Sequence, residues 1–194
     1  MTTDIKPRFQ SFDEYLSYDD GTNRLYELFN GELIEVPPES GNNVQIANRL
    51  FLIFARLIGT DRVRGHGLEL EVNGEPRNRY PDLTILRAEH IPQLAKRNTL
   101  RLSMTPPLLV IEVSSPGELQ RNRDYIAKRS QYQDCGIPEY WIIDPQTQSI
   151  LVLELVASAY TEVGNFSDRD QVISPQFPEL NLIAAEVFGS TKVD

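Results

Sequence analysis

The sequence predicts an α/β (α+β) domain in which a mixed central β-sheet is flanked by helices. Three patterns support this class: an almost wholly apolar run at residues 108–113, apolar residues at helical spacing over 44–58, and Asn-Gly dipeptides beside short apolar segments. The predicted order is hairpin, helix, meander, helix and hairpin, which is typical of a sheet covered by helices. A chain of 194 residues is most simply one domain, spanning 1–194.

The first two elements have strong local signals. A hairpin is expected over residues 25–36, because Asn30-Gly31 is the strongest two-residue turn signal. A helix is expected over 44–58, where apolar side chains recur every three or four residues, and Gly59 is suited to end it.

The middle of the chain is predicted to be a meander followed by a second helix. Residues 68–72 alternate Leu, Glu, Leu, Glu and Val, and an Asn-Gly turn returns the chain as a strand over 78–86. The second helix begins either at the capping box Ser115-Pro116-Gly117-Glu118 or near Asn122. The other expected elements are a short helix or loop at 88–98, a central strand at 108–113, the end of the second helix at Cys135, strands at 139–144 and 149–155, an extension of the sheet at 160–163, and a tail at 177–188 that ends in a short helix.

Composition limits the classes of function. One cysteine rules out an internal disulfide and fits a reducing cytoplasm, and two histidines with one cysteine are too few for a four-ligand structural zinc site. No apolar run approaches the roughly 20 residues that cross a bilayer, and the first residues contain no hydrophobic signal-peptide core. The net charge of −9 is unfavourable for binding nucleic-acid phosphates, although local clusters of Arg and Lys occur. The sequence contains no phosphate-loop, dinucleotide-binding, nucleophile-elbow or zinc-protease motif.

Two carboxylates stand where an apolar sheet core is expected to continue. Glu112 follows Leu108 and Val110 on one face of the central strand, and Asp82 follows Pro81 where the preceding strand begins or bends. Charged residues are rarely fully buried unless they are paired or bind a metal. A lone acid is more often a salt bridge or a turn cap, but two acids in apolar settings on adjacent strands favour a divalent-cation and phosphodiester site.

A lysine on the second helix adds to this pattern. Tyr125, Lys128, Tyr132 and Cys135 fall on one stripe of that helix, and the stripe is expected to face the sheet. A lysine in such a stripe either extends its amine outward to solvent or directs it at a buried anion. With two carboxylates nearby, an ion-paired or catalytic amine becomes credible.

The remaining polar and aromatic candidates have simpler interpretations. The acids of the hairpin form its polar face, and the residues that flank the first helix cap it. One histidine marks a bent strand, the other lies on the surface, and an adjacent aromatic pair belongs to the core. These residues are Glu27, Glu32 and Glu35 in the hairpin, Glu39 and Asn43 beside the helix, His66 in the bend, His90 on the surface, and Tyr140 and Trp141 in the core.

At these positions the chain resembles the Uma-type restriction endonucleases, a family first catalogued as a domain of unknown function within the PD-(D/E)XK nuclease superfamily. The resemblance spans about residues 9–188. The last of the four stretches that carry it is the most distinctive. They are 26–33 (Tyr-Glu-Leu-Phe-Asn-Gly-Glu-Leu), 81–83 (Pro-Asp-Leu), 111–116 (Ile-Glu-Val-Ser-Ser-Pro), and Lys128 through 136–145 (Gly-Ile-Pro-Glu-Tyr-Trp-Ile-Ile-Asp-Pro).

The resemblance implies a restriction-endonuclease-like core that hydrolyses DNA with Mg²⁺, or with Mn²⁺ in its place. It implies that Asp82, Glu112 and the carbonyl of Val113 bind the metal. It also implies that Lys128 orients the attacking water or stabilises charge on the phosphate, with Tyr132 in support. Nucleases of this kind often pair, so a homodimer is expected.

The chain departs from the family pattern in two places. The superfamily lysine usually lies two residues after the glutamate, where this chain has Ser114, and the resemblance assigns the amine to Lys128 instead. Many members have a histidine near the start of the first helix, where this chain has Asn42-Asn43. Glu39 is then the candidate for a third helper.

Three functional hypotheses remain open at the level of sequence. The first is the metal-dependent endonuclease. The second is a catalytically silent nuclease fold used as a binding or regulatory module, which the acidic charge and the displaced lysine favour. The third is a structural oligomer with a salt-bridged core, which predicts Lys128 paired to Asp82 or Glu112 and no open cleft. All three place the protein in the cytoplasm and away from membranes.

Overall fold

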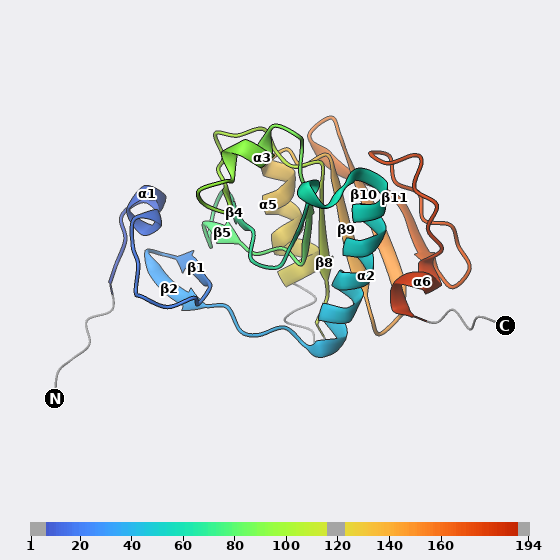
Figure 1. Ribbon diagram of the computed structural model, residues 1–194, viewed down its shortest axis with the longest axis horizontal. Helices are drawn as coiled ribbons and strands as arrows, with labels where there is room; N and C mark the ends of the chain where they lie inside the picture. Colours follow the sequence, from blue (N-terminus) through green and yellow to red (C-terminus); the bar gives the residue numbers. More distant parts are fainter. Residues whose placement is uncertain (1–6, 116–122, 190–194) are drawn as a thin grey trace.

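A six-stranded mixed sheet forms the centre of the computed structural model, which describes residues 7–115 and 123–189 (Figure 1). Its strand order is β11-β10-β9-β8-β6-β3, and only β8 and β9 run parallel. The strands are β3 (Val63–Gly65), β6 (Leu83–Ile85), β8 (Leu109–Val113), β9 (Glu139–Asp144), β10 (Ser149–Val156) and β11 (Ala159–Ser167). The predicted mixed sheet flanked by helices is therefore confirmed.

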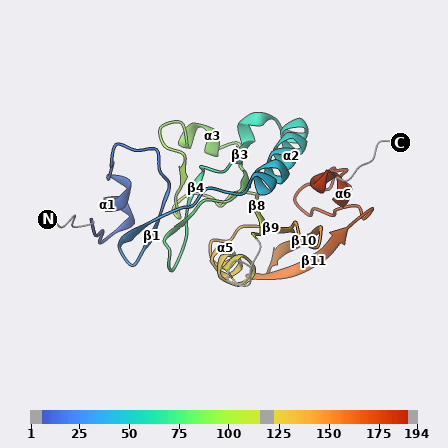
Figure 2. The same cartoon turned by 90° about the horizontal axis from the view of Figure 1, so that it is seen from below.

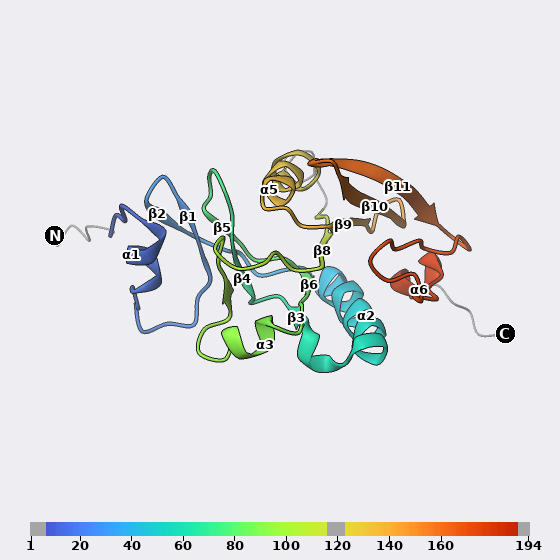
Figure 3. The ribbon, with the colours of Figure 1, turned by 90° about the horizontal axis from the view of Figure 1, so that it is seen from above.

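Helices cover the two faces of this sheet (Figures 2 and 3). On one face lies α2 (Gly41–Ile58), whose buried side chains pack with alternate residues of β8 such as Ile111. On the other lies a helix formed by π-helical η2 (Arg123–Lys128) and α5 (Arg129–Asp134), whose Tyr132 packs in a second core cluster. Since Val110 belongs to this second cluster, Glu112 faces the same side.

Smaller elements extend the fold at one end. The hairpin of β1 (Tyr26–Phe29) and β2 (Glu32–Glu35) lies beside α1 (Phe12–Leu16), at the left of Figure 1. A three-stranded sheet of order β5-β4-β7 joins this end to the centre. The remaining elements are β4 (Glu69–Glu71), β5 (Asn78–Arg79), β7 (Thr99–Leu100), η1 (Thr60–Arg62), α3 (His90–Gln93) and α6 (Ala184–Phe188).

The first hairpin and the first helix occur where the sequence predicts them. Asn30 and Gly31 both have positive φ, at 50° and 79°, as a tight turn between twisted strands requires. A side chain at Gly31 would also meet the carbonyl oxygen of Phe9 at 2.6 Å. The cap of α2 differs from the expectation: Ser40, rather than Glu39 or Asn43, accepts the backbone N–H of Asn43.

The strand predicted over residues 78–86 is instead two strands in different sheets. Its first part, β5, pairs with β4, and its second part, β6, pairs with β3 and β8. The break falls at Pro81, which has no backbone N–H to give to a ladder. This change of sheet places Asp82 immediately before β6.

Other predictions have mixed outcomes. Tyr140 and Trp141 are fully buried core aromatics, as expected. The prediction that His90 lies on the surface was wrong: the residue is buried, and its ring nitrogens interact with the Thr105 carbonyl and the Arg87 N–H. The predicted start of the second helix falls on 116–122, outside the described residues. In the part of the chain that is described, no helix is long and apolar enough to cross a membrane.

Candidate active site

Asp82 and Glu112 lie opposite each other on neighbouring strands. The antiparallel register pairs Leu83 with Ile111, and its continuation by one residue aligns Asp82 with Glu112 on the same face. The two residues are only 6% and 2% exposed. Asp82 Oδ2 accepts the backbone N–H of Val113 at 2.7 Å, which holds the carboxylate against the end of β8.

Both oxygens of Glu112 receive hydrogen bonds from the helix that covers this face. Lys128 Nζ lies 2.6 Å from Oε2, and the Tyr132 hydroxyl lies 2.5 Å from Oε1. Burial, and then the charge of Glu112, raises the pKa of Tyr132 well above its ordinary value, so the hydroxyl remains a donor. The amine therefore faces the buried carboxylate and is not extended to solvent.

The helix geometry explains why two donors reach one carboxylate. Lys128 and Tyr132 are four residues apart, so they share one side of the helix. Lys128 is also the last residue of the π-helical segment, and π-helical turns occur frequently at functional sites. Its side chain is 14% exposed, so the amine is shielded but still close to solvent.

The start of α2 contributes a third group. Asn43 is 2% exposed, and its amide nitrogen lies 3.0 Å from Glu39 Oε2, 3.2 Å from the Ser115 hydroxyl and 3.4 Å from the Val113 carbonyl. Asn43 thus links the candidate helper Glu39 to the carbonyl that the resemblance implies as a metal ligand. The sequence suggested a cap here; the structure shows a bridge from helix to strand.

Asp82, Glu112 and Lys128 line an open cavity of about 450 Å³. Ser114 is not among its lining residues; its hydroxyl donates to the Ile143 carbonyl, so it cannot substitute for a lysine here. The third hypothesis predicted a paired Lys128 and no cleft, and the structure has the pair together with a cleft. The polar side chains on the wall are Glu27, Glu35, Glu39, Ser40, His66, Tyr80, Asp82, Glu112, Ser115 and Lys128.

The electrostatics of the cavity favour a bound cation. Burial, and then the neighbouring Glu112, raises the pKa of Asp82 well above its ordinary value, and Lys128 and the Val113 N–H only partly offset this. Ionised carboxylates held this close repel each other, and a divalent ion between them would remove that cost.

The donor set fits a hard cation. Residues 7–115 and 123–189 contain no group of three or more His, Cys, Asp or Glu that could hold a metal, so the protein side of a site would be two carboxylates and a carbonyl. Mg²⁺ commonly binds through one or two carboxylates and keeps several waters.

Sequence reasoning missed two features of the cavity wall. Glu27, interpreted as part of a polar strand face, forms an ion pair with the buried Arg79, Nη1 to Oε1 at 3.1 Å. His66, interpreted as marking a bend, lines the cavity. Burial lowers the pKa of its imidazole, the charge of Glu39 raises it in part, and the charge of Lys128 lowers it again. The pairing of β3 with β6 brings His66 to the cavity, and strands of three residues have too little local sequence signal to predict that pairing.

Comparison with solved structures places the fold in a known class. The chain is similar to the crystal structure of a putative nuclease belonging to DUF820 from Anabaena variabilis ATCC 29413, with a TM-score of 0.66 and 20% sequence identity. The match covers 91% of this chain and 96% of that one. The chain thus shares the fold of that protein.

The family follows from the sequence itself. The model of the Uma2 family, described as "Putative restriction endonuclease", matches residues 12–186. This chain belongs to the Uma2 family. No curated protein matches it.

Proposed function

We propose that the protein is a Mg²⁺-dependent endonuclease that hydrolyses DNA phosphodiester bonds, with Asp82 and Glu112 as its metal ligands. One observation carries the proposal: two buried carboxylates on neighbouring strands face a single open cavity together with the amine of Lys128. Membership of the Uma2 family and the nuclease fold support the same chemistry.

The metal would be held by Asp82, Glu112 and the carbonyl of Val113. When bound, Mg²⁺ polarises the scissile phosphate and lowers the pKa of an attacking water. Tyr132 fixes the Glu112 carboxylate from one side. Asn43 reaches the carbonyl of Val113 from the other, and the backbone N–H of Val113 holds Asp82, so each of the three ligand groups has a buried hydrogen-bond partner.

Lys128 supplies the positive charge of the cavity. Its amine donates to Glu112 Oε2 at 2.6 Å, and its side chain is 14% exposed, close to solvent. In the proposed reaction the ammonium would orient a water or stabilise negative charge as it develops on a phosphate oxygen. Glu39, held by Asn43, can accept a proton from that water at the edge of the site.

Several parts of the proposal come from the family and not from the geometry. DNA is the proposed substrate, Mn²⁺ can replace Mg²⁺, and a homodimer would supply a second site for the opposite strand. The cytoplasm is the proposed location. The overall charge of −9 implies that DNA is bound by a local cationic surface, and that binding weakens steeply as salt is raised.

Calorimetric titration of Mn²⁺ into the wild type and Glu112→Gln, followed by plasmid nicking with the same samples, tests the function. Glu32→Gln is the matched control, because Glu32 is exposed on the hairpin and does not line the cavity. We expect Glu112→Gln to lose binding and nicking together while the control keeps both. Retention of full nicking by Glu112→Gln would refute the assignment.

The silent-module hypothesis is the second candidate. The ion pair between Lys128 and Glu112 favours it, because an amine at 2.6 Å neutralises the carboxylate without a metal. It predicts that the wild type nicks no plasmid at any Mg²⁺ or Mn²⁺ concentration and binds Mn²⁺ weakly or not at all. Metal-dependent nicking that Glu112→Gln abolishes excludes it.

A further inference from the structure

A second cavity, of about 500 Å³, lies next to the candidate active site. The two cavities share a wall that includes Glu39, His66 and Asp82, together with the segment 35–38 that leads from the hairpin to α2. Asp82 therefore faces both spaces, and whatever occupies the second cavity lies beside the proposed metal site.

The far wall of this cavity is an apolar face of α2 that the protein core leaves incompletely covered. The helix buries Ile46, Leu50 and Phe54 in the core, as expected for the sheet-facing side. Val44, Ala47 and Phe51 follow at intervals of three and four residues on another side and line the cavity. Val44 is 44% exposed. An uncovered apolar face inside a cavity commonly marks a ligand-binding surface.

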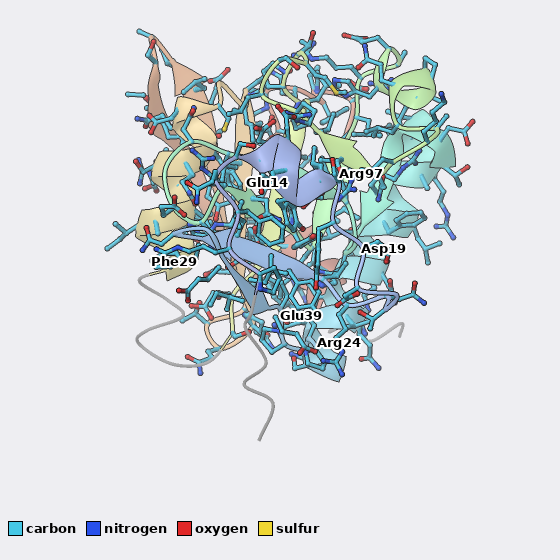
Figure 4. The ribbon with its side chains drawn as sticks, turned by 90° about the vertical axis from the view of Figure 1, so that its left-hand side faces the viewer. Glu14, Asp19, Arg24, Phe29, Glu39 and Arg97 are labelled. Carbon is cyan, nitrogen blue, oxygen red and sulfur yellow. The ribbon has the colours of Figure 1, made fainter. Side chains whose placement is uncertain are left out.

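Polar groups stand at the rim of the same cavity. Asn48 lies on α2 beside the apolar stripe, and Arg24 lies on the chain that enters the hairpin. Figure 4 shows Arg24 next to Glu39 at the lower edge of this end of the molecule. Amide and guanidinium groups are the side chains that commonly hydrogen-bond the edges of nucleobases.

His66 marks the boundary between the two cavities. The pairing of Gly65 with Leu83, continued by one residue, aligns His66 with Asp82, so His66, Asp82 and Glu112 form a row across β3, β6 and β8. Within the described part of the chain the His66 ring contacts Tyr80 at 6.4 Å between centroids but makes no hydrogen bond. His90, by contrast, uses both ring nitrogens in the fold.

We propose that this second cavity binds the nucleobase next to the scissile phosphate, with Val44, Ala47 and Phe51 against the face of the base and His66 at the passage from phosphate to base. This inference rests on the proposed function, since that function places the phosphate beside Asp82. Bases stack on apolar and aromatic side chains with little dependence on sequence. A nucleotide whose phosphate occupies the first cavity has its base one sugar away, and the second cavity shares the wall at His66 and Asp82 with the first.

A nucleobase explains the surface better than a second protein chain does. The apolar face is recessed in a cavity that continues into the carboxylate wall, and a flat protein partner would leave Asp82 without a cation. A nucleotide brings both the apolar ring and the phosphate that completes a metal site. A second copy of this chain on the same face would instead make self-association sensitive to Asn48→Phe.

The test compares two nucleotides, which differ in the position of the phosphate, with a sugar phosphate that has no base. Thymidine 3′-monophosphate, thymidine 5′-monophosphate and 2-deoxyribose 5-phosphate are titrated into the protein with Mn²⁺. We expect at least one nucleotide to bind about tenfold tighter than the sugar phosphate, within the range that one stacked base contributes. Ala47→Phe and Asn48→Phe fill the cavity and should remove that difference. Gln45→Phe, exposed on the same helix outside the cavity, should preserve it.

A nuclear magnetic resonance measurement reports directly on the shared wall. The chain has two histidines, so imidazole spectra of protein labelled with ¹⁵N contain signals from His66 and His90 only. Nucleotide binding should shift the signals of His66 and leave those of His90 in place. Substitution of His66 by Gln assigns the signals.

The outcomes separate this inference from the proposed function. Equal binding of nucleotides and sugar phosphate, with a nuclease that is active on plasmid, overturns the base subsite and leaves the function standing. Absence of any ligand binding and of nicking overturns both. A change in sedimentation of Asn48→Phe relative to Gln45→Phe would show that a second copy covers the face, which also overturns the subsite.

Discussion

Lys128 Nζ lies 2.6 Å from Oε2 of Glu112, so the covering helix and the central strand are joined by an ion pair inside the candidate site. Its side chains are 14% and 3% exposed, which makes the pair largely shielded from water. The ammonium of Lys128 and a divalent metal ion from solution would therefore interact with the same carboxylate, that of Glu112. The effects of removing Lys128 therefore separate a catalytic amine from a structural one.

Lys128→Met should lower plasmid nicking by about 100-fold, since loss of one donor to a developing charge commonly has an effect of this size. Its Mn²⁺ affinity should stay the same or rise, because the competing ammonium is gone. Titration calorimetry and nicking, measured together, check this, with Lys96→Met as an exposed-lysine control. A variant that nicks at the wild-type rate would contradict a role for the amine in the reaction.

Asp82→Asn should stabilise the metal-free protein at neutral pH by about 0.5–2 kcal/mol. Burial and then Glu112 raise the pKa of Asp82, so the folded state binds a proton more tightly than the unfolded state does. Stability of the wild type therefore falls as the pH rises from the ordinary Asp value of 3.8 through the raised pKa. Asn retains an oxygen for the Val113 N–H without the charge.

Thermal unfolding of wild type and Asp82→Asn in EDTA, from pH 3 to pH 8, measures this difference. The two curves should coincide at the acid end, where Asp82 is protonated in both states, and separate as the pH rises. Equal stability at every pH would mean that the carboxylate has no electrostatic cost in the folded protein.

Arg79→Gln should destabilise the protein by about 3 kcal/mol or more, because it removes a buried guanidinium that pairs with the shielded Glu27. Arg79 is 2% exposed and also donates to Gln131 on the helix that carries Lys128. Arg24→Gln is the matched control: its ion pair with Glu35 is exposed, and its loss should change stability by less than about 0.5 kcal/mol. Urea unfolding of both variants measures the two losses of stability. Equal small losses would show that the buried ion pair contributes nothing to the stability of the fold.

Much of the candidate site could be predicted from the sequence because its key residues interrupt strong patterns. Glu112 lies near the end of an apolar strand, where alternation places it on the core side, and Asp82 follows Pro81 directly before the neighbouring strand. The helical spacing of Lys128 and Tyr132 predicts that they face the same way, and in the structure both reach Glu112. The hairpin at Asn30-Gly31 is equally local, since two positive φ angles specify it.

The rest of the fold and of the site depends on contacts between distant segments. β7 is only two residues long and pairs in parallel with β4, about thirty residues earlier, so no local pattern marks it. The position of His66 follows from register across β3 and β6, and that of Asn43 from how α2 crosses the end of β8. Residue types such as these are common in turns and caps, so their sequence positions alone favour the simpler interpretation.

Tyr132→Phe should weaken Mn²⁺ binding several-fold and lower stability by about 1–3 kcal/mol, because the variant removes a hydrogen bond to a charged carboxylate and keeps the ring. Tyr160→Phe is its matched control. Tyr160 belongs to the same core cluster, and its buried hydroxyl donates to the Ile137 carbonyl at 2.9 Å, away from the cavity. Both variants should lose stability, but only Tyr132→Phe should lose metal affinity, since only its hydroxyl fixes Glu112. Calorimetric Mn²⁺ titrations below the unfolding temperature of each variant make the comparison. If the two variants bind Mn²⁺ alike, Tyr132 supports the fold and not the proposed ligand.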